Sequence, residues 1–277
     1  MRAAAVQLNS TTDRDRNVAC AERLVRGAAA AGAELVVLPE KWNVLGGGDA
    51  LRSGAETLDG PTLTMARAWA RELGITLVAG SVAERAEGEE RMFNTSALIG
   101  PTGDIEAVYR KIHMFDVEAG GVTYRESAHE QPGQDIVVAE AAGVEVGLSI
   151  CYDLRFPELY RILAVRGARV ITVPSAFTLA TGRDHWEVLL RARAIENQAF
   201  VVAANQIGTV PPHFSSYGRS MIVDPWGVVQ AQAPDEETFV IADLDLESQE
   251  RVRTTLPSLA NRQPHAYRWP ELIEAGV

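Results

Sequence analysis

The sequence predicts an α/β protein folded as a four-layer α-β-β-α sandwich with an internal pseudo-two-fold axis. Short apolar runs alternate with amphipathic helical patterns, which is typical of parallel strands joined by right-handed crossovers. The same order of elements occurs twice, so we expect two sheets that pack face to face and carry helices on their outer faces. Hydrophobic residues make up 47% of the 277 residues, which is enough for such a core. No linker separates the halves, and we expect residues 1–277 to form a single domain.

The first half is predicted to follow the order β-α-β-α-β-β-β. Strands are expected near residues 2–8, 35–39, 76–83, 93–99 and 105–110, and helices near 14–31 and 61–73. Residues 41–60 are expected to form a loop. Its run Gly46-Gly47-Gly48 lacks the Lys-Ser/Thr pair of a phosphate-binding loop, so we interpret it as a mobile rim.

The second half repeats this order. Strands are expected near residues 145–150, 169–173, 199–205, 220–224 and 228–232, helices near 156–166 and 182–198, and a further strand near 238–243. Two local matches support the repeat. Gly32–Glu40 parallels Gly167–Ser175, and Ser96–Gly103 parallels Ser220–Gly227, where Pro and Gly mark equivalent turns between strands.

Composition excludes several functional classes. A formal net charge of −11 argues against a nucleic-acid partner, because phosphate binding needs clustered Lys and Arg. No apolar stretch approaches the ~20 residues of a membrane span, and residues 1–8 are too short for a secretory signal. Only Cys20 and Cys151 are present, which fits a reducing compartment, so we expect a cytoplasmic protein. The five histidines show no ligand spacing, and no dinucleotide motif occurs, so we expect neither a metal site nor a dinucleotide site.

Cys151 directly follows the apolar run Val144–Ile150 and precedes a turn that leads into a helix near Pro157. This position should expose the thiol, and the first N–H groups of the helix should favour a thiolate. A lone cysteine is more often a small buried hydrophobe, which is our interpretation of Cys20. The polar, turn-forming residues after Cys151 favour a reactive thiol instead.

Two further side chains complete a candidate set for thiol chemistry. Glu40 ends the apolar strand Leu35–Pro39, and the repeat places its strand end and that of Cys151 at one cleft, so Glu40 is a candidate general base. A capping or surface glutamate is the alternative. Lys111 follows a strand of the first half and would by itself be read as a surface lysine. A cysteine hydrolase, however, needs a cation for its oxyanion, and Lys111 could supply it.

Two other classes stay open at this point. A papain-like hydrolase would pair Cys151 with His185. A non-catalytic scaffold or binding protein of the same fold would carry an unreactive Cys151. Trp186 could line a pocket or fill the core between a helix and a sheet, and the core is favoured because aromatic residues of helices are usually buried there.

Three segments resemble the nitrilase superfamily of carbon–nitrogen hydrolases, and the likeness extends over nearly the whole chain. They are Leu38-Pro39-Glu40, Tyr109–Asp116 and Ser149–Glu158. The resemblance implies an α-β-β-α fold, a Glu40-Lys111-Cys151 triad, no cofactor, and a homodimer or higher homo-oligomer. It also implies that Glu126 is a second active-site glutamate that orients the lysine or the substrate.

Residues 175–198 and 217–227 resemble the deaminated-glutathione amidase type of the Nit amidase branch more than ω-amidase. The resemblance implies a thiol amidohydrolase that converts a small, carboxylate-bearing linear amide to an acid and ammonia through a cysteine acyl-enzyme. An ω-amidase or an N-carbamoyl amide hydrolase remains an alternative, and nitrile hydrolysis is less favoured. Arg183-Asp184 and Asn205–Ile207 depart from the pattern of the branch and leave the substrate open.

The expected mechanism gives each of these residues a task. Glu40 takes the proton of Cys151, and the oxyanion is held by Lys111 and the backbone N–H of Tyr152. A substrate carboxylate needs a cationic partner, for which Arg155 and Arg183 are the candidates. Arg155 could instead pair with Glu158 or Asp153 near the start of its helix.

Overall fold

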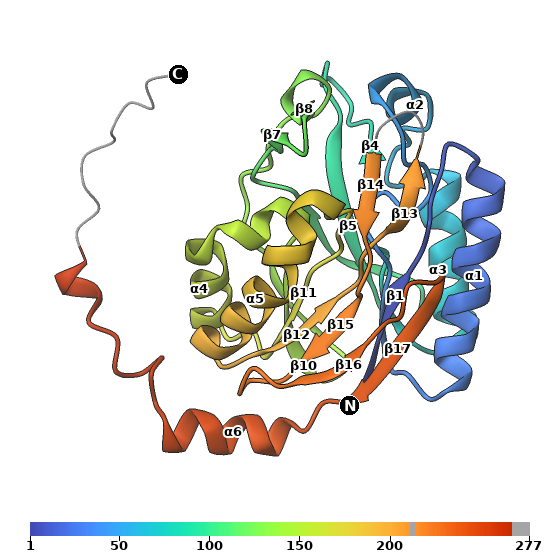
Figure 1. Ribbon diagram of the computed structural model, residues 1–277. Coiled ribbons are helices and arrows are strands. Elements are labelled where there is room, and N and C mark those ends of the chain that lie inside the picture. Colours follow the sequence, from blue (N-terminus) through green and yellow to red (C-terminus); the bar gives the residue numbers. More distant parts are fainter. Residues whose placement is uncertain (211–213, 268–277) are drawn as a thin grey trace.

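Two mixed sheets lie face to face between two layers of helices (Figure 1). The structure is a computed structural model that describes residues 1–210 and 214–267. Helices α1 (Arg14–Ala30) and α3 (Pro61–Leu73) cover the first sheet, and α4 (Pro157–Val165) and α5 (Leu179–Asn197) cover the second. The predicted α-β-β-α fold is confirmed.

The first sheet has a parallel centre and antiparallel edges. Its strands follow the order β17-β1-β2-β3-β5-β4, with β6 also paired to β5. Strands β1, β2 and β3 are parallel, whereas β5 and β17 are antiparallel to their neighbours. The bounds are β1 (Arg2–Gln7), β2 (Leu35–Val37), β3 (Thr76–Val78), β4 (Val82–Glu84), β5 (Phe93–Ile99), β6 (Ile105–Arg110) and β17 (Thr238–Asp243).

The second sheet has the same plan. Its order is β16-β15-β12-β11-β10-β9, with β10, β11 and β12 parallel and β9, β15 and β16 antiparallel to their neighbours. The bounds are β9 (Val138–Ala141), β10 (Val144–Leu148), β11 (Val170–Thr172), β12 (Phe200–Ala203), β15 (Met221–Val223) and β16 (Val229–Gln232).

The internal repeat therefore relates β1-β2-β3-β5-β6 to β10-β11-β12-β15-β16. The paired turns agree in detail. The N–H of Gly103 donates to the carbonyl of Gly100, and the N–H of Gly227 donates to that of Asp224, both at 2.9 Å. Both turning glycines have a φ of +85°, a conformation that glycine adopts at little cost.

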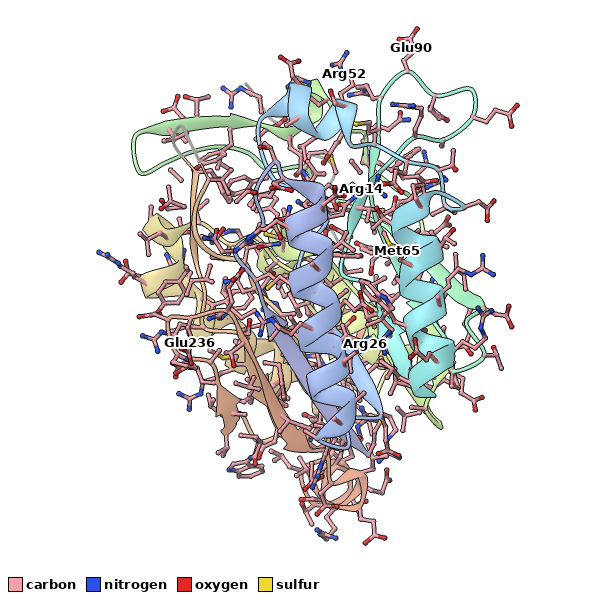
Figure 2. The ribbon with its side chains drawn as sticks, turned by 90° about the vertical axis from the view of Figure 1, so that its right-hand side faces the viewer. Arg14, Arg26, Arg52, Met65, Glu90 and Glu236 are labelled. Atoms are coloured by element: carbon pink, nitrogen blue, oxygen red, sulfur yellow. The ribbon has the colours of Figure 1, made fainter. Side chains whose placement is uncertain are left out.

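Alternation along β1 shows how one strand serves two cores. Ala3 and Ala5 face the second sheet, whereas Ala4 and Val6 pack under α1 and α3. Successive strand side chains point to opposite faces, so a strand buried on both sides must be apolar throughout. Figure 2 shows α1 and α3 side by side on the outer face, where Arg26 of α1 donates to both carboxylate oxygens of Glu72 of α3 at 2.9 and 2.8 Å.

Several short elements were not predicted. They are α2 (Gly48–Ser53) within the expected loop 41–60, the hairpin of β7 (Asp116–Ala119) and β8 (Val122–Arg125), the hairpin of β13 (Ile207–Val210) and β14 (Phe214–Tyr217), strand β9, and α6 (Leu246–Thr255). Among the described residues, no helix has the length and apolar character needed to cross a membrane.

Candidate active site

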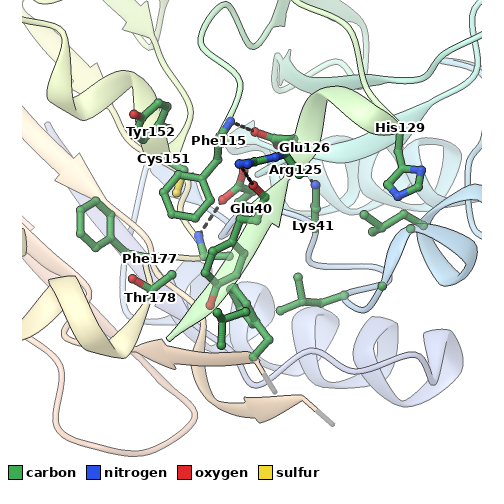
Figure 3. A pocket seen from close by; sticks show the side chains of 18 of the residues that line it. Glu40, Lys41, Phe115, Arg125, Glu126, His129, Cys151, Tyr152, Phe177 and Thr178 are labelled. Carbon is green, nitrogen blue, oxygen red and sulfur yellow. Dashed lines mark hydrogen bonds and ion pairs between the residues drawn. The ribbon is translucent and has the colours of Figure 1, made fainter. Parts of the chain in front are cut away.

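A cavity of about 470 Å³ lies beyond the carboxyl ends of β2 and β10, where the two sheets meet. Its lining comes from both halves of the chain and includes Glu40, Lys111, Glu126 and Cys151. Figure 3 shows the labelled side chains of Glu40, Cys151 and Glu126 gathered at this cavity. The position follows from the topology, because the carboxyl ends of parallel strands are where α/β proteins place functional groups.

Cys151 begins a short 3₁₀ turn, η2 (Cys151–Arg155), which precedes α4. Its backbone has a φ of +48°, which is rare for a residue with a side chain, and its N–H donates to the carbonyl of Pro174 at 2.9 Å. Strained conformations of this kind concentrate at functional sites. The bond to Pro174 connects η2 to the end of β11.

The structure corrects the expected state of the Cys151 thiol. The residue is only 8% exposed, and α4 begins six residues later at Pro157 rather than at the sulfur. Burial and the nearby Glu40 carboxylate raise the pKa of Cys151 well above its usual range, and the opposing effect of Lys111 does not cancel them. Cys151 therefore rests as a neutral thiol beside a carboxylate, not as a preformed thiolate.

Glu40 is buried and held from three sides. Its Oε1 accepts from Lys111 Nζ at 3.1 Å and from Asn94 Nδ2 at 2.8 Å, and its Oε2 accepts from the N–H of Ala176 at 2.8 Å. The side chain is 3% exposed. Ala176 follows β11 of the second sheet, so this carboxylate joins the two halves of the molecule at the cavity.

Lys111 lies just after β6 and is 1% exposed. Its Nζ contacts Glu40 Oε1 at 3.1 Å and both oxygens of Glu126 at 2.9 and 2.8 Å. Burial lowers the pKa of Lys111, but Glu126 and Glu40 more than offset this effect and raise the pKa well above its usual range. The ammonium group is therefore charged, and the reading of Lys111 as a solvated surface lysine is excluded.

Glu126 begins the 3₁₀ turn η1 (Glu126–Ala128) after β8, and its carboxylate accepts several hydrogen bonds. In addition to Lys111, its Oε2 accepts from the N–H of Phe115 at 2.7 Å and its Oε1 accepts from Asn94 Nδ2 at 3.2 Å (Figure 3). Burial opposes ionisation, yet Lys111 and Lys41 hold the pKa of Glu126 well below its ordinary value. The structure thus brings Glu40, Lys111 and Glu126 into one network, and Cys151 lines the same cavity.

Of the candidates for binding the oxyanion and the substrate, Tyr152 and Arg155 line the cavity, whereas Arg183 does not. The N–H of Tyr152 has no acceptor within residues 1–210 and 214–267, so it is available beside Cys151. Arg155 lines the cavity, with its guanidinium 5.1 Å from the ring centroid of Phe177. Among the residues that the structure describes, no ion pair joins Arg155 to Glu158 or Asp153. Arg183 is exposed on α5 and does not line the cavity.

His185 is also not brought to the thiol. It is exposed on α5, and its Nδ1 lies 3.1 Å from Nη1 of Arg155. This position does not support a papain-like Cys151–His185 pair. Trp186, one residue on, is fully buried, and its Nε1 donates to the carbonyl of Arg219 at 2.8 Å, which confirms its expected place in the core.

Sequence reasoning missed three polar residues of this network. Asn94 of β5 donates to both Glu40 and Glu126, and Lys41 and Glu130 form a further buried ion pair next to Glu126. Two signals were present. Lys41 directly follows Glu40 after an apolar strand, and Glu130 follows Glu126 at a spacing of four residues, which places two side chains on one side of a helical turn.

Comparisons with known proteins agree with this architecture. The family model described as "Carbon-nitrogen hydrolase" matches residues 2–254. A deaminated glutathione amidase of Synechocystis sp. is 41% identical over 265 residues, which covers 94% of this chain and 97% of that protein. The omega-amidase NIT2 of Homo sapiens is 37% identical over 267 residues and covers 96% of each.

A solved structure gives the same assignment. Saccharomyces cerevisiae Nit3, described as a member of branch 10 of the nitrilase superfamily, superposes with a TM-score of 0.87 at 30% identity, covering 96% of this chain and 97% of that one. The match of sequence and fold extends over both halves and the whole cavity. The chain therefore belongs to the carbon–nitrogen hydrolase family of the nitrilase superfamily, and it is a hydrolase that acts on carbon–nitrogen bonds.

Proposed function

We propose that this protein is a thiol amidohydrolase in which Cys151 is the nucleophile, Glu40 the general base and Lys111 the oxyanion cation. The observation that carries the proposal is the convergence of these three buried groups on one cavity, with Glu40 and Lys111 in contact at 3.1 Å. Their residue types match the needs of acyl transfer from an amide: a thiol, a base for its proton and a positive charge for the developing oxyanion.

The first half of the reaction forms an acyl-enzyme. Glu40 accepts the thiol proton as the sulfur attacks the amide carbonyl, so the neutral resting thiol costs no separate ionisation step. The tetrahedral oxyanion is stabilised by the Lys111 ammonium and the N–H of Tyr152. Glu40 then returns the proton to the amide nitrogen, the C–N bond breaks, and the amine leaves.

The second half releases the acid. A water molecule gives a proton to Glu40 and attacks the thioester carbonyl, and the same two donors hold the new oxyanion. The C–S bond breaks, and the thiol takes back the proton. Glu126 does not exchange a proton in this scheme. Its carboxylate keeps Lys111 charged and in place, since both of its oxygens contact Nζ.

The substrate is proposed to be a small amide that carries a carboxylate. The names of the relatives point to deaminated glutathione or an ω-amide, and the identities of 41% and 37% favour the first. Arg155 supports an anionic substrate, because its guanidinium lines the cavity and has no carboxylate partner among the described residues. Aromatic rings of Phe115, Tyr152 and Phe177 would pack on the rest of the molecule.

The deciding experiment compares wild type with Cys151→Ala on deaminated glutathione, 2-oxoglutaramate and an N-carbamoyl amino acid. Both the released acid and the released amine should be followed, because an amide nitrogen that carries a peptide leaves as an amine rather than as ammonia. Turnover that is lost in Cys151→Ala and retained in the Cys20→Ser control supports the proposal. Turnover that survives in Cys151→Ala refutes it.

We also propose that the protein is a cytoplasmic homodimer that joins through the outer layer of α4 and α5. Large apolar side chains are exposed on these two helices, among them Val188 at 65%, Ile195 at 50% and Val165 at 50%. A second copy of the same surface would remove them from water.

A further inference from the structure

The Lys41 ammonium and the Glu130 carboxyl group form a second buried contact beside the Lys111 network. Lys41 Nζ lies 2.9 Å from Glu130 Oε1 and 3.1 Å from its Oε2, with 10% and 1% of the two side chains exposed. The same Nζ lies 3.5 Å from Glu126 Oε1. Figure 3 shows Lys41 on the side of Glu126 that faces His129. The mechanism proposed above uses neither Lys41 nor Glu130.

The backbone holds both residues of this pair in fixed positions. Lys41 has a φ of +52°, and its N–H donates to Ser81 Oγ at 3.0 Å. Glu130 donates its own N–H to the carbonyl of Glu126 at 2.9 Å. The residues on either side of Glu130 exchange hydrogen bonds with Met92, at 3.1 and 2.8 Å. A left-handed, non-glycine conformation next to the general base is a constraint that a solvated lysine would not need.

Glu126 is the point at which the two ion pairs meet. It receives Lys111 from one side and Lys41 from the other, and it is 9% exposed. Two ammonium groups thus face three carboxylates, those of Glu40, Glu126 and Glu130. Buried charges are stable only when they are paired, so removal of one cation should displace the carboxylate that it shares with the other.

We propose that Lys41 and Glu130 are positioning residues that fix Glu126 and, through Glu126, hold the Lys111 ammonium at Cys151. This inference rests on the proposed thiol amidohydrolase activity and adds two residues that support its catalytic groups. Lys41 lines the cavity but already has two carboxylate partners, so its charge serves the network rather than a substrate anion.

The protonation states complete the charge balance. Burial and the adjacent Glu126 carboxylate raise the pKa of Glu130 to about 8, although Lys41 lowers it. Burial lowers the pKa of Lys41, but Glu130, Glu126 and Glu40 raise this pKa by more than burial lowers it, so Lys41 stays charged. Near pH 7 Glu130 is then protonated, and two cations balance the two remaining anions.

Other charged groups near Glu130 are turned away from it. The adjacent His129 directs its Nδ1 to Nη2 of Arg52 in α2 at 3.4 Å, and Lys111 reaches Glu126 rather than Glu130. Lys41 and Glu126 are therefore the groups that set the titration of Glu130. As the pH rises through about 8, ionised Glu130 draws Lys41 away from Glu126, and Glu126 loses one of its supports.

The first test compares Lys41→Met with Lys41→Arg in steady-state kinetics on the amide that wild type hydrolyses. Displacement of a catalytic group by ~1 Å can cost about a hundredfold, so Lys41→Met should lower kcat by at least about tenfold and leave KM within about twofold. Lys41→Arg keeps the cation and should recover part of kcat. An unchanged kcat in Lys41→Met, or a rise in KM alone, would overturn the inference, the latter because it would make Lys41 a substrate-binding residue.

The second test uses Glu130→Gln, in which the amide imitates a protonated carboxyl group. Because this amide cannot ionise, the variant removes the charge change of Glu130 without emptying its place in the network. Wild-type kcat should fall as the pH rises through about 8, and the fall should be absent in Glu130→Gln. A purely structural role would lower the melting temperature without moving this limb of the pH profile, and an identical limb in both proteins would refute the proposal.

A third measurement separates this inference from the proposed activity. Iodoacetamide alkylation of Cys151, followed by mass spectrometry in a Cys20→Ser background, needs no substrate. Lys111 lowers the pKa of Cys151, so its displacement in Lys41→Met should slow alkylation at a given pH. If wild type hydrolyses no amide, the proposed function fails, while equal alkylation rates with and without Lys41 would count against the positioning role alone.

Discussion

At the scale of single residues, the Glu40 carboxylate has two opposing effects on the Cys151 thiol. In the proposed mechanism Glu40 accepts the thiol proton, yet its negative charge is one reason that the pKa of Cys151 is raised. Removal of this charge should therefore make the thiol easier to ionise while it destroys catalysis. The two effects can be measured separately.

Glu40→Gln should lower kcat by a factor of about 10² to 10⁴, the range attributed to general base catalysis. The same change should speed the alkylation of Cys151 by iodoacetamide at pH 8, because the pKa of the thiol falls when the carboxylate is neutralised. Stopped assays of amide hydrolysis and mass spectrometry of the alkylated protein provide the two readouts. Slower alkylation in Glu40→Gln would mean that Glu40 assists rather than opposes ionisation of the resting thiol. The exposed Glu34→Gln is the control.

Residue identity could be predicted from sequence where a side chain ends an apolar run. This signal predicts Glu40 and Cys151, and the chemistry that a thiol needs predicts Lys111; all three line the cavity. Glu126 lies in a turn whose place depends on a hairpin that was not predicted, so only the family resemblance identified it. Arg183, a candidate partner for a substrate carboxylate, lies outside the cavity, since the buried stripe of α5 runs through Gly182 and Trp186 and leaves Arg183 exposed.

At the scale of elements, the turn η2 is held by one carboxylate. Asp153 Oδ2 accepts from Tyr109 Oη at 2.7 Å and from the N–H of Ile150 at 2.8 Å, and Asp153 Oδ1 lies 2.7 Å from Nδ1 of His113. Tyr109 belongs to β6 of the first sheet, whereas Ile150 leads into η2. The bond between Tyr109 and Asp153 thus connects the elements that carry Lys111 and Cys151.

Tyr109→Phe removes one hydrogen bond to a buried carboxylate, which is typically worth about 1.5–3 kcal/mol. We expect the free energy of unfolding to fall by about this amount and kcat to fall as well, because the nucleophile turn loses its tie to β6. Urea titration followed by circular dichroism measures the first effect. Tyr267→Phe, at an exposed tyrosine, should change neither quantity. Equal stabilities of Tyr109→Phe and wild type would show that Asp153 is held without Tyr109.

The longer elements were predictable because their apolar periodicity spans several turns or a full strand. The short ones depend on signals that a periodicity search passes over. Gly120-Gly121 lies between two runs with alternating exposure, which is a signal for the β7–β8 hairpin, and both glycines have positive φ values of 60° and 77°. Helix α2 has only six residues, and its place is set by packing of Leu51 rather than by local propensity.

At the scale of the whole molecule, the exposed apolar face of α4 and α5 determines the proposed assembly. Val188→Glu places a charge at its most exposed valine and should shift the protein from dimer to monomer, because an unpaired charge cannot be buried cheaply. Light scattering after size exclusion gives the mass. Thr64→Glu, exposed on α3 in the opposite helix layer, should leave the dimer intact. A wild-type monomer would contradict the proposed assembly.

The predicted single domain has its own test. The inter-sheet core contains residues of both halves, among them Ala5 of β1 and Val201 of β12, so neither half has a complete core alone. We expect urea unfolding to be one transition, with coincident midpoints for circular dichroism and tryptophan fluorescence. Trp69 reports on the first half and Trp186 on the second, and two separated midpoints would indicate two domains.

Strand β17 pairs with β1, although β1 is the first strand along the described chain and β17 is the last. Residues 238–243 form the edge of the first sheet, although they follow every strand of the second sheet in sequence. Strand β9 occupies the matching edge next to β10. The edge of the first sheet is therefore completed only after every strand of the second sheet has been synthesised. A chain that began at β9 and passed from β17 directly into β1 would build each sheet in one continuous stretch.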